Sequence, residues 1–361
     1  MKEPSIEVFH TCRGTRIYRI LLDIFPGFQG YAHVLFLKDV VALIDVGSGF
    51  GDCNEQLEAG LDEIRTNYGE IAHWDNLTHI LISHAHIDHY GGLSFVQSRC
   101  QAPIGIHLLD RRVLTCYEDQ LTIVAHKLHT FLIEAGVSPE REKRLMDLYL
   151  INKHLFKSIP VNFTFNEVGM KIGSISIIHV PGHCPGQVIF QVDDILLSGD
   201  HILQETSPHQ SPEQLTSNTG LGHYLESLEK TRPISHSINW VLGGHEDPFT
   251  DLEARINAIE QLHQDRLNQI LKLLCVSMTL TEISDQLFPD THGYHELLAL
   301  EETGAHLEYL HQRGYIYIDN LESAIEDGSA PFYYRQLENI FATETNLNEI
   351  ILQDVRRGEK V

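Results

Sequence analysis

The chain has 361 residues, which exceeds the length of one average domain and favours a large domain with a smaller second one. It carries 50 Asp and Glu residues against 26 Lys and Arg, a formal net charge of −24, and has no Lys/Arg-rich run. An acidic surface of this kind repels phosphate backbones and anionic lipids. The composition therefore argues against a nucleic-acid-binding or membrane-surface protein.

The N-terminal segment MKEPSIEVFHTCRG has no apolar stretch behind a basic start. No apolar run approaches the roughly 20 residues needed to cross a bilayer. The six cysteines are scattered and include no C-x-x-C pair, which is typical of buried free thiols in a reducing compartment. We therefore expect a cytoplasmic protein with no membrane contact.

The first part of the chain alternates between strand and helix signals. Residues 5–47 are rich in β-branched and aromatic residues between Gly, Pro and Asp turns, which predicts several strands. Residues 53–69 have apolar residues at helical spacing and end in Gly69, and an apolar strand follows at residues 79–83. Strand, helix and buried strand in this order predict an α/β fold.

Residues 110–158 have almost no strand signal, which predicts a helical insertion. Gly136 is expected to end one helix, and Ser138-Pro139-Glu140 to begin the next with an N-cap, a proline at the first position and an early acid. This insertion is either a lid over the functional site, a homodimer surface, or a simple packed excursion.

A second strand-rich block covers residues 161–200 and contains a tight hairpin turn at Asp193-Asp194. A helix near residues 224–231 and one more strand lead to His245. A run of strands followed by alternating helices and strands thus occurs twice in the chain, once before and once after the helical insertion.

Residues 251–274 predict one long helix, and the pattern changes after it. A short helix, a longer helix at residues 295–314 and two strand-like pieces then predict a winged-helix domain. We place a boundary near Cys275, with a main domain at residues 1–274 and a winged-helix domain and tail at residues 275–361. The longer helix is acidic, so packing or dimerisation is favoured over DNA reading.

Histidine and aspartate crowd into the segment SHAHIDHYGG, directly after a predicted apolar strand. His84 and His86 are two residues apart in an extended segment, so their side chains point to the same side. Asp88 and His89 lie where the loop turns into a helix, and two glycines follow that let this helix start close to the strand ends. The segment therefore predicts ligands for two metal ions, because a polar loop with accidental histidines explains the pattern poorly.

Three distant residues are predicted to complete the two sites, because each follows an apolar strand. They are His183 in HVPGHCPG, Asp200 in LLSGDH and His245 in LGGHEDP. A carboxylate can bridge two ions, which suits Asp200, while each histidine adds a ligand to one ion. The donors are all nitrogen and oxygen, which suits zinc, iron or manganese alike.

The H-x-H-x-D-H motif followed by these three residues resembles the metallo-β-lactamase superfamily over about residues 5–250. The resemblance implies a four-layer αββα sandwich with two divalent metal ions at one edge of its sheets, and Asp45 supporting the site by hydrogen bonding. The tail resembles lactamase-like hydrolases that include an endoribonuclease. The resemblance further implies that His84, His86 and His183 bind the first metal, that Asp88, His89 and His245 bind the second, and that Asp200 bridges them.

The function predicted from this set is hydrolysis by hydroxide held between two metal ions, zinc being the first choice. Asp88 is expected to act in catalysis by aiming the hydroxide. A small ester or thioester, as in the glyoxalase II group, is the favoured small-molecule substrate. The alternative is a single-stranded RNA endoribonuclease, which shares the two-domain layout but conflicts with the negative charge.

Three other functions fit the sequence less well. The lactam-cleaving enzymes of this fold typically lack the pairing of His89 with Asp200. A persulfide dioxygenase with a single iron would leave part of the ligand set unused. A non-catalytic metal sensor would not need the complete set.

Overall fold

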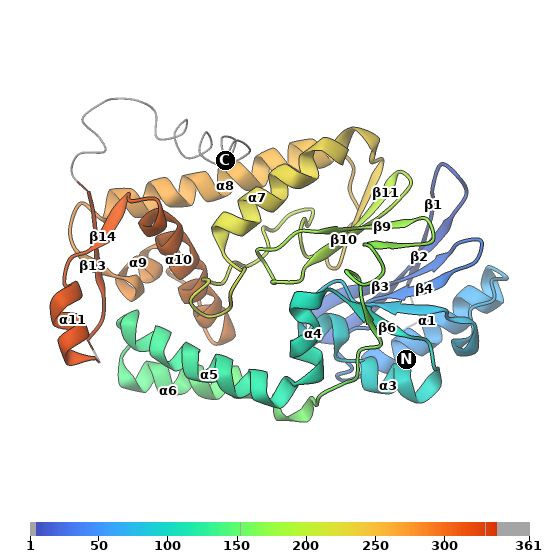
Figure 1. Cartoon of the computed structure of the whole chain (residues 1–361), viewed down its shortest axis with the longest axis horizontal. Coiled ribbons are helices and arrows are strands. Elements are labelled where there is room, and N and C mark those ends of the chain that lie inside the picture. The colour runs from blue at the N-terminus through green and yellow to red at the C-terminus, as the bar shows by residue number, and fades with distance from the viewer. Residues whose placement is uncertain (1–4, 152, 329, 338–361) are drawn as a thin grey trace. The chain divides into compact units, whose positions relative to one another are not determined.

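The computed structural model describes residues 5–151, 153–328 and 330–337, so the predicted tail after Leu337 lies outside the described residues. The chain divides into two compact units, and Figure 1 shows their helices and strands. The first unit comprises Met1–Tyr117, Phe156–Pro208 and Thr231–Arg255. The second comprises Glu118–Leu155, His209–Lys230 and Ile256–Val361.

A seven-stranded mixed sheet forms one layer of the first unit, with its strands in chain order from β1 to β7. β1 to β4 pair antiparallel through short connections, whereas β4 to β7 are parallel and read as short apolar runs, as strands buried on both faces do. The strands are β1 (Ile6–His10), β2 (Arg16–Phe25), β3 (Phe28–Phe36), β4 (Val41–Ile44), β5 (His79–Leu81), β6 (Ile104–Ile106) and β7 (Phe163–Thr164).

A five-stranded sheet forms the second layer, in the order β12-β11-β10-β9-β8. Its strands are β8 (Lys171–Ile172), β9 (Ile175–His179), β10 (Val188–Val192), β11 (Ile195–Gly199) and β12 (Trp240–Gly243). β10 and β11 form the predicted hairpin, and Asp193 in its turn has a φ of 53°. β11 and β12 are parallel, so their carboxyl ends lie next to each other.

The two sheets share one hydrophobic core, which confirms the predicted α/β sandwich of mixed sheets and helices. Each of its aliphatic and aromatic side chains contributes about 1.5–3 kcal/mol when it is fully buried. Figure 1 shows the helices α1 (Cys53–Asn67) and α3 (Leu93–Arg99) along the first sheet, on the side away from the second sheet. The core includes Leu35, Ile44 and Leu81 of the first sheet and Phe190, Leu197 and Leu242 of the second.

The helical insertion is confirmed as a set of helices, α4 (Leu108–Thr115), α5 (Tyr117–Glu134) and α6 (Pro139–Leu150). Gly136 follows α5 with a φ of 81°, a left-handed conformation that favours glycine. The side chain of Ser138 accepts a hydrogen bond from the Arg141 N–H and caps α6, as its sequence predicts.

Ion pairs join the insertion helix α6 to the C-terminal helices of the second unit, α9 (Leu280–Leu287) and α10 (Tyr294–Gln312). Arg141 pairs with Asp285 at 3.0 Å and with Glu296. Arg144 adds a second contact to Glu296 at 2.8 Å. Helix α6 of the insertion is therefore packed within this unit, and the roles of the insertion as a lid or a dimer surface stay predictions.

The remaining elements of the second unit include the helices α7 (Leu221–Thr231), α8 (Leu252–Leu273) and α11 (Leu321–Asp327). A small antiparallel sheet has the order β13-β15-β14, with β13 (Met278–Thr279), β14 (Ile316–Ile318) and β15 (Tyr333–Gln336). Residues 118–155 of the insertion and most of α8 cluster with these C-terminal elements, whereas α4 belongs to the first unit. That residues 1–274 form an independent domain stays a prediction.

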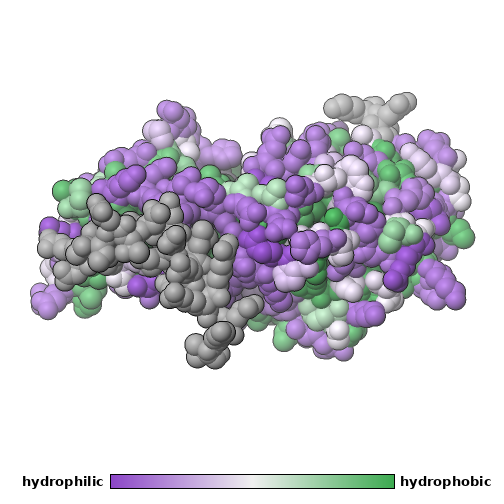
Figure 2. All heavy atoms as spheres, turned by 90° about the horizontal axis from the view of Figure 1, so that it is seen from above, coloured by the Kyte–Doolittle hydropathy of each residue, from purple (hydrophilic) through white to green (hydrophobic). Residues whose placement is uncertain are grey.

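Within the described residues, no helix has both the length and the apolar character needed to span a membrane. The face drawn in Figure 2 is mostly hydrophilic, and its hydrophobic atoms are scattered in small groups.

Candidate metal centre

The seven predicted ligands all belong to the first unit and lie in loops or in a short helix at strand ends. The loop after β5 carries two of them, and the four-residue helix α2 (Ile87–Tyr90) carries two more. The β9–β10 loop and the segments after β11 and β12 carry one each. In chain order the seven are His84, His86, Asp88, His89, His183, Asp200 and His245.

The two glycines after the histidine motif allow α2 to pack closely against the loop after β4. A Cβ atom at Gly91 would lie 2.2 Å from the backbone oxygen of Ser48. A Cβ atom at Gly92 would lie 2.4 Å from the backbone oxygen of Val46. The close approach expected from these glycines is therefore confirmed.

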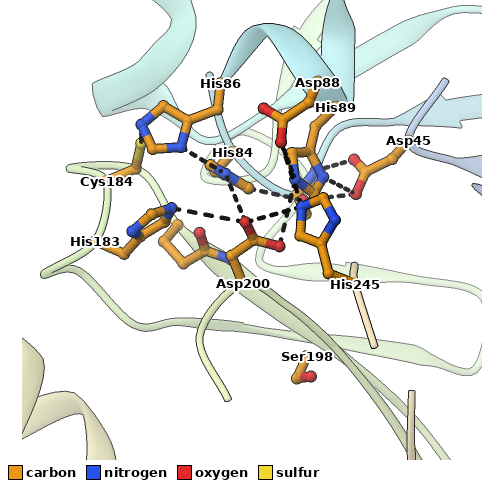
Figure 3. Close-up of polar contacts among 12 residues, drawn as sticks. Asp45, His84, His86, Asp88, His89, His183, Cys184, Ser198, Asp200 and His245 are labelled. Carbon is orange, nitrogen blue, oxygen red and sulfur yellow. Dashed lines mark hydrogen bonds and ion pairs between the residues drawn. The ribbon is translucent and has the colours of Figure 1, made fainter. Parts of the chain in front are cut away.

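Three histidines form the first group of ligand atoms (Figure 3). Nε2 of His84 lies 3.1 Å from Nδ1 of His86, and the ring of His183 lies 4.5 Å from that of His86. Burial lowers the pKa of His84 well below its usual value, and burial together with His183 lowers the pKa of His86 to about 3. Both rings are therefore neutral near pH 7, as a metal ligand must be.

Two histidines and two aspartates form the second group (Figure 3). Nε2 of His245 lies 3.2 Å from Oδ2 of Asp88 and 3.4 Å from Oδ2 of Asp200. Nε2 of His89 lies 3.3 Å from Oδ1 of Asp200. The structure thus brings together all four side chains that the sequence predicts for this group.

Asp200 faces both groups. Its Oδ2 atom lies 3.9 Å from Nε2 of His84 and 3.8 Å from Nε2 of His183, which belong to the first group. The same carboxylate faces His89 and His245 of the second group at 3.3 and 3.4 Å. This is the position expected of a bridging carboxylate.

The carboxylates give the second group a negative charge that needs a nearby cation. Burial alone would lower the pKa of His245, but Asp200 and Asp88 outweigh it and raise that pKa to about 10. Burial alone would raise the pKa of Asp200, but His245 and His89 lower it well below its usual range. A buried carboxylate pair of this kind is stable only with a proton on the imidazoles or with a metal ion.

Hydrogen bonds to the outer ring atoms orient the ligands. Asp45 accepts a hydrogen bond from Nδ1 of His89 at 2.9 Å and from the Ser83 hydroxyl at 2.7 Å. Nδ1 of His245 donates to the backbone oxygen of Gln29 at 2.7 Å. Such contacts fix the tautomer and the ring orientation of a ligand histidine. The supporting role expected of Asp45 matches this geometry.

The donor atoms fit a pair of metal ions. Nε2 of His89 and Oδ1 of Asp200 are buried and make no hydrogen bond with any described residue. Their separation of 3.3 Å is close to the ~3.4 Å between two ligand atoms that bind one tetrahedral ion at about 2.1 Å. The donors in both groups are nitrogen and oxygen atoms. His201 lies outside both groups and hydrogen-bonds Thr231 at 3.1 Å.

Three neighbours of the site were not expected from the sequence. Sγ of Cys184 lies 3.2 Å from Nε2 of His86, on the far side of that ring from His84. The ring of Phe28, 46% exposed, lies 4.5 Å from the ring of His245. Asp110 hydrogen-bonds the loops of the first group. Phe28 follows the Pro26-Gly27 turn, and an aromatic residue next to a turn is the only feature of the sequence that could have pointed to it.

A third group of possible ligand atoms lies in the second unit, on α8 and α10. Nδ1 of His263 lies 3.1 Å from Nε2 of His306 and 3.9 Å from Oε1 of Glu302. The Glu302 oxygens already accept hydrogen bonds from Arg266 and from the Gln210 N–H, each at 2.7 Å. A divalent ion would add two positive charges to a buried pair that is already neutral, so we interpret this group as packing between helices.

The family model of the Metallo-beta-lactamase superfamily matches residues 26–273, which carry all seven predicted ligands. The chain belongs to the metallo-β-lactamase superfamily. With the site assembled as above, it is a metal-dependent hydrolase of that superfamily.

The chain is also similar to a named protein and to two solved structures at low sequence identity. The chain is 23% identical over 287 residues to the protein of Bacillus subtilis (strain 168) named "Probable metallo-hydrolase YqjP", with 75% of this chain and 85% of that protein covered. The metallo-beta-lactamase family protein TTHA1429 from Thermus thermophilus has a TM-score of 0.67 and 22% identity, covering 89% of this chain and 98% of that one. A beta-lactamase domain protein from Burkholderia ambifaria has a TM-score of 0.69 and 19% identity, covering 92% and 94%. The two solved structures support the fold.

Proposed function

We propose that this hydrolase cleaves a small ester or thioester and that it uses two divalent metal ions, zinc first, with iron or manganese as alternatives. When bound, such ions polarise the carbonyl oxygen and bring the pKa of water near neutrality. The observation that carries the proposal is the Asp200 carboxylate, which faces both groups of donors. In this proposal His84, His86 and His183 hold the first ion, Asp88, His89 and His245 the second, and Asp200 both.

Asp88 is the residue that we propose to act on the attacking water. Its side chain is 17% exposed, compared with 9% for Asp200 and 2% for His89, so it is the acidic group nearest to solvent. A carboxylate at this place can accept a hydrogen bond from water and aim its lone pair at the substrate. Nε2 of His89 and Nε2 of His245 both face Oδ2 of Asp88, at 3.6 and 3.2 Å, and hold its side chain in place.

Phe28 supports a substrate with an apolar part. Its half-exposed ring, at the start of β3, lies against the ring of His245, so an apolar surface borders the second group of ligands. An acyl or alcohol group packed there would lose water from its own surface and from the phenyl ring.

Replacement of Phe28 by alanine is expected to raise KM for an aromatic ester by about tenfold, because most of the contact of one ring is lost, on the order of 1.5 kcal/mol. The same change should leave KM for an acetate ester of a small alcohol within about twofold. Steady-state kinetics on the two esters, with metal content measured in parallel, test this expectation. An equal rise of KM for both esters would contradict an apolar subsite at Phe28.

The C-terminal elements fit the winged-helix domain that we propose for residues 275–361. The order β13, α9, α10, β14 and β15 agrees with the pattern of two helices and a β-ribbon, with the short helix α11 added between the last two strands. In the described part of this region, Glu296 and Glu302 of α10 pair with arginines of the same unit. These contacts favour a packing role for α10.

The six cysteines are free thiols, which supports our proposal of a reducing compartment, the cytoplasm.

A substrate screen tests the proposed function. The zinc-loaded chain is incubated with aryl esters, S-acyl thioesters and an end-labelled single-stranded RNA, before and after chelation. We expect turnover of esters or thioesters that chelator stops and zinc restores, with intact RNA. Cleavage of RNA without ester or thioester turnover would reject the proposal in favour of the endoribonuclease.

A further inference from the structure

Asp110 ties together the two loops that supply the first group of ligands. It lies in the first turn of α4 and is completely buried. Its Oδ2 atom accepts a hydrogen bond from the backbone N–H of Ala85 at 2.9 Å, between His84 and His86. Its Oδ1 atom accepts one from the N–H of Gly186 at 2.7 Å, in the β9–β10 loop that carries His183. One side chain thus holds two segments about 100 residues apart in the chain.

The packing around this carboxylate is tight. A Cβ atom at Gly186 would lie 2.6 Å from Cγ of Asp110, so a glycine is needed at this position for the contact. The same two loops also meet where Sγ of Cys184 lies 3.2 Å from Nε2 of His86. Two independent contacts therefore hold the His183 loop against the loop after β5.

The chemistry of the contact requires a carboxylate. Two buried N–H donors need two acceptors, and a carboxylate supplies both without adding a donor. An asparagine would keep one acceptor and turn an NH₂ group toward the other N–H, so it would release one loop with little change in volume. Burial raises the pKa of Asp110 to about 6, although the two N–H donors lower it. At pH 8 the side chain is therefore ionised, and a comparison of the wild type with Asp110→Asn is a comparison of a carboxylate with an amide.

We infer that Asp110 is a positioning residue that sets the place of His183 relative to His84 and His86, and thereby the affinity of the chain for the first metal ion. The inference rests on the proposed function, because it needs these three histidines to be ligands. Asp110 touches neither group of ligand atoms directly and acts through the backbone of their loops. Loss of a contact that orients metal ligands typically lowers metal affinity about 10- to 100-fold.

The test is zinc binding by Asp110→Asn at pH 8, measured by competition with a chromophoric chelator. We expect one of the two zinc affinities to fall by about tenfold or more and the other to change little. The visible absorption of the cobalt-substituted protein should change as well, because the first site is distorted. A merely structural role of Asp110 would instead lower the melting temperature of the metal-free chain and leave both affinities and the cobalt spectrum unchanged, which would overturn the inference.

The matched control is Asp194→Asn, at the opposite end of β11 from Asp200. Asp194 also joins two segments, since it accepts hydrogen bonds from the Cys12 N–H and from the Asn239 side chain, both at 2.7 Å. This control should keep both zinc affinities. If Asp110→Asn does not fold, Gly186→Ala is measured instead, and normal zinc affinity in that variant would overturn the inference. A wild-type chain that binds no zinc would defeat the proposed function itself.

Discussion

Replacement of Asp200 by asparagine is expected to remove the second metal ion and to lower ester turnover by more than about 100-fold. Loss of a contact that only orients a ligand already costs 10- to 100-fold, and Asp200 faces both groups directly. The amide would leave His89 and His245 without the carboxylate charge that lies 3.3–3.4 Å from them. Metal content and steady-state kinetics of the purified variant measure both effects.

The control for this prediction is again Asp194→Asn, which changes the same residue type at the other end of β11. It should have two metal ions per chain and normal turnover. Two tightly bound ions together with normal turnover in Asp200→Asn would show that Asp200 does not bridge the sites.

Replacement of His84 by alanine is expected to remove the first metal ion and to lower the melting temperature by about 5 °C. A ligand at a hundredfold excess over its Kd stabilises the folded state by about 2.7 kcal/mol, and this contribution would be lost. Chelation of the wild-type chain should give at least this decrease, because it removes the first ion together with the second. Scanning calorimetry with and without chelator checks both expectations.

His79→Ala is the matched control for the thermal experiment, because His79 begins β5 at the end away from the metal ligands. This variant should keep the full chelator-dependent decrease in melting temperature. An His84→Ala chain that loses as many degrees on chelation as the wild type would contradict the role of His84 as a ligand.

The ligand set could be predicted from sequence because of where each residue lies in its segment. Asp200 and His245 follow the apolar strands β11 and β12, which are parallel and adjacent. The carboxyl ends of adjacent parallel strands lie at the same edge of a sheet, and ligand-binding sites of α/β proteins form at that edge. His84 and His86 are placed by local spacing alone. Residue type and position in the strand were therefore sufficient to place these four side chains.

Asp110 could not be predicted, because its partners are the backbone N–H groups of Ala85 and Gly186. Every residue except proline carries such a group, so no residue type marks the contact.

The place of the insertion was equally hidden from the sequence. Arg141 and Arg144 of α6 both pair with Glu296, about 150 residues further along the chain. Ion pairs over such a distance have no local signature. The helices of the insertion were predictable from Gly136 and Ser138, because turns and caps depend on neighbouring residues.

The most direct measurement of the central claim is anomalous X-ray diffraction at the zinc absorption edge from a crystal of the zinc-loaded chain. We expect two anomalous peaks per chain, one among His84, His86 and His183, the other among Asp88, His89 and His245, with Asp200 in contact with both. A crystal with well-ordered zinc elsewhere and no peak within ligand distance of these side chains would contradict it.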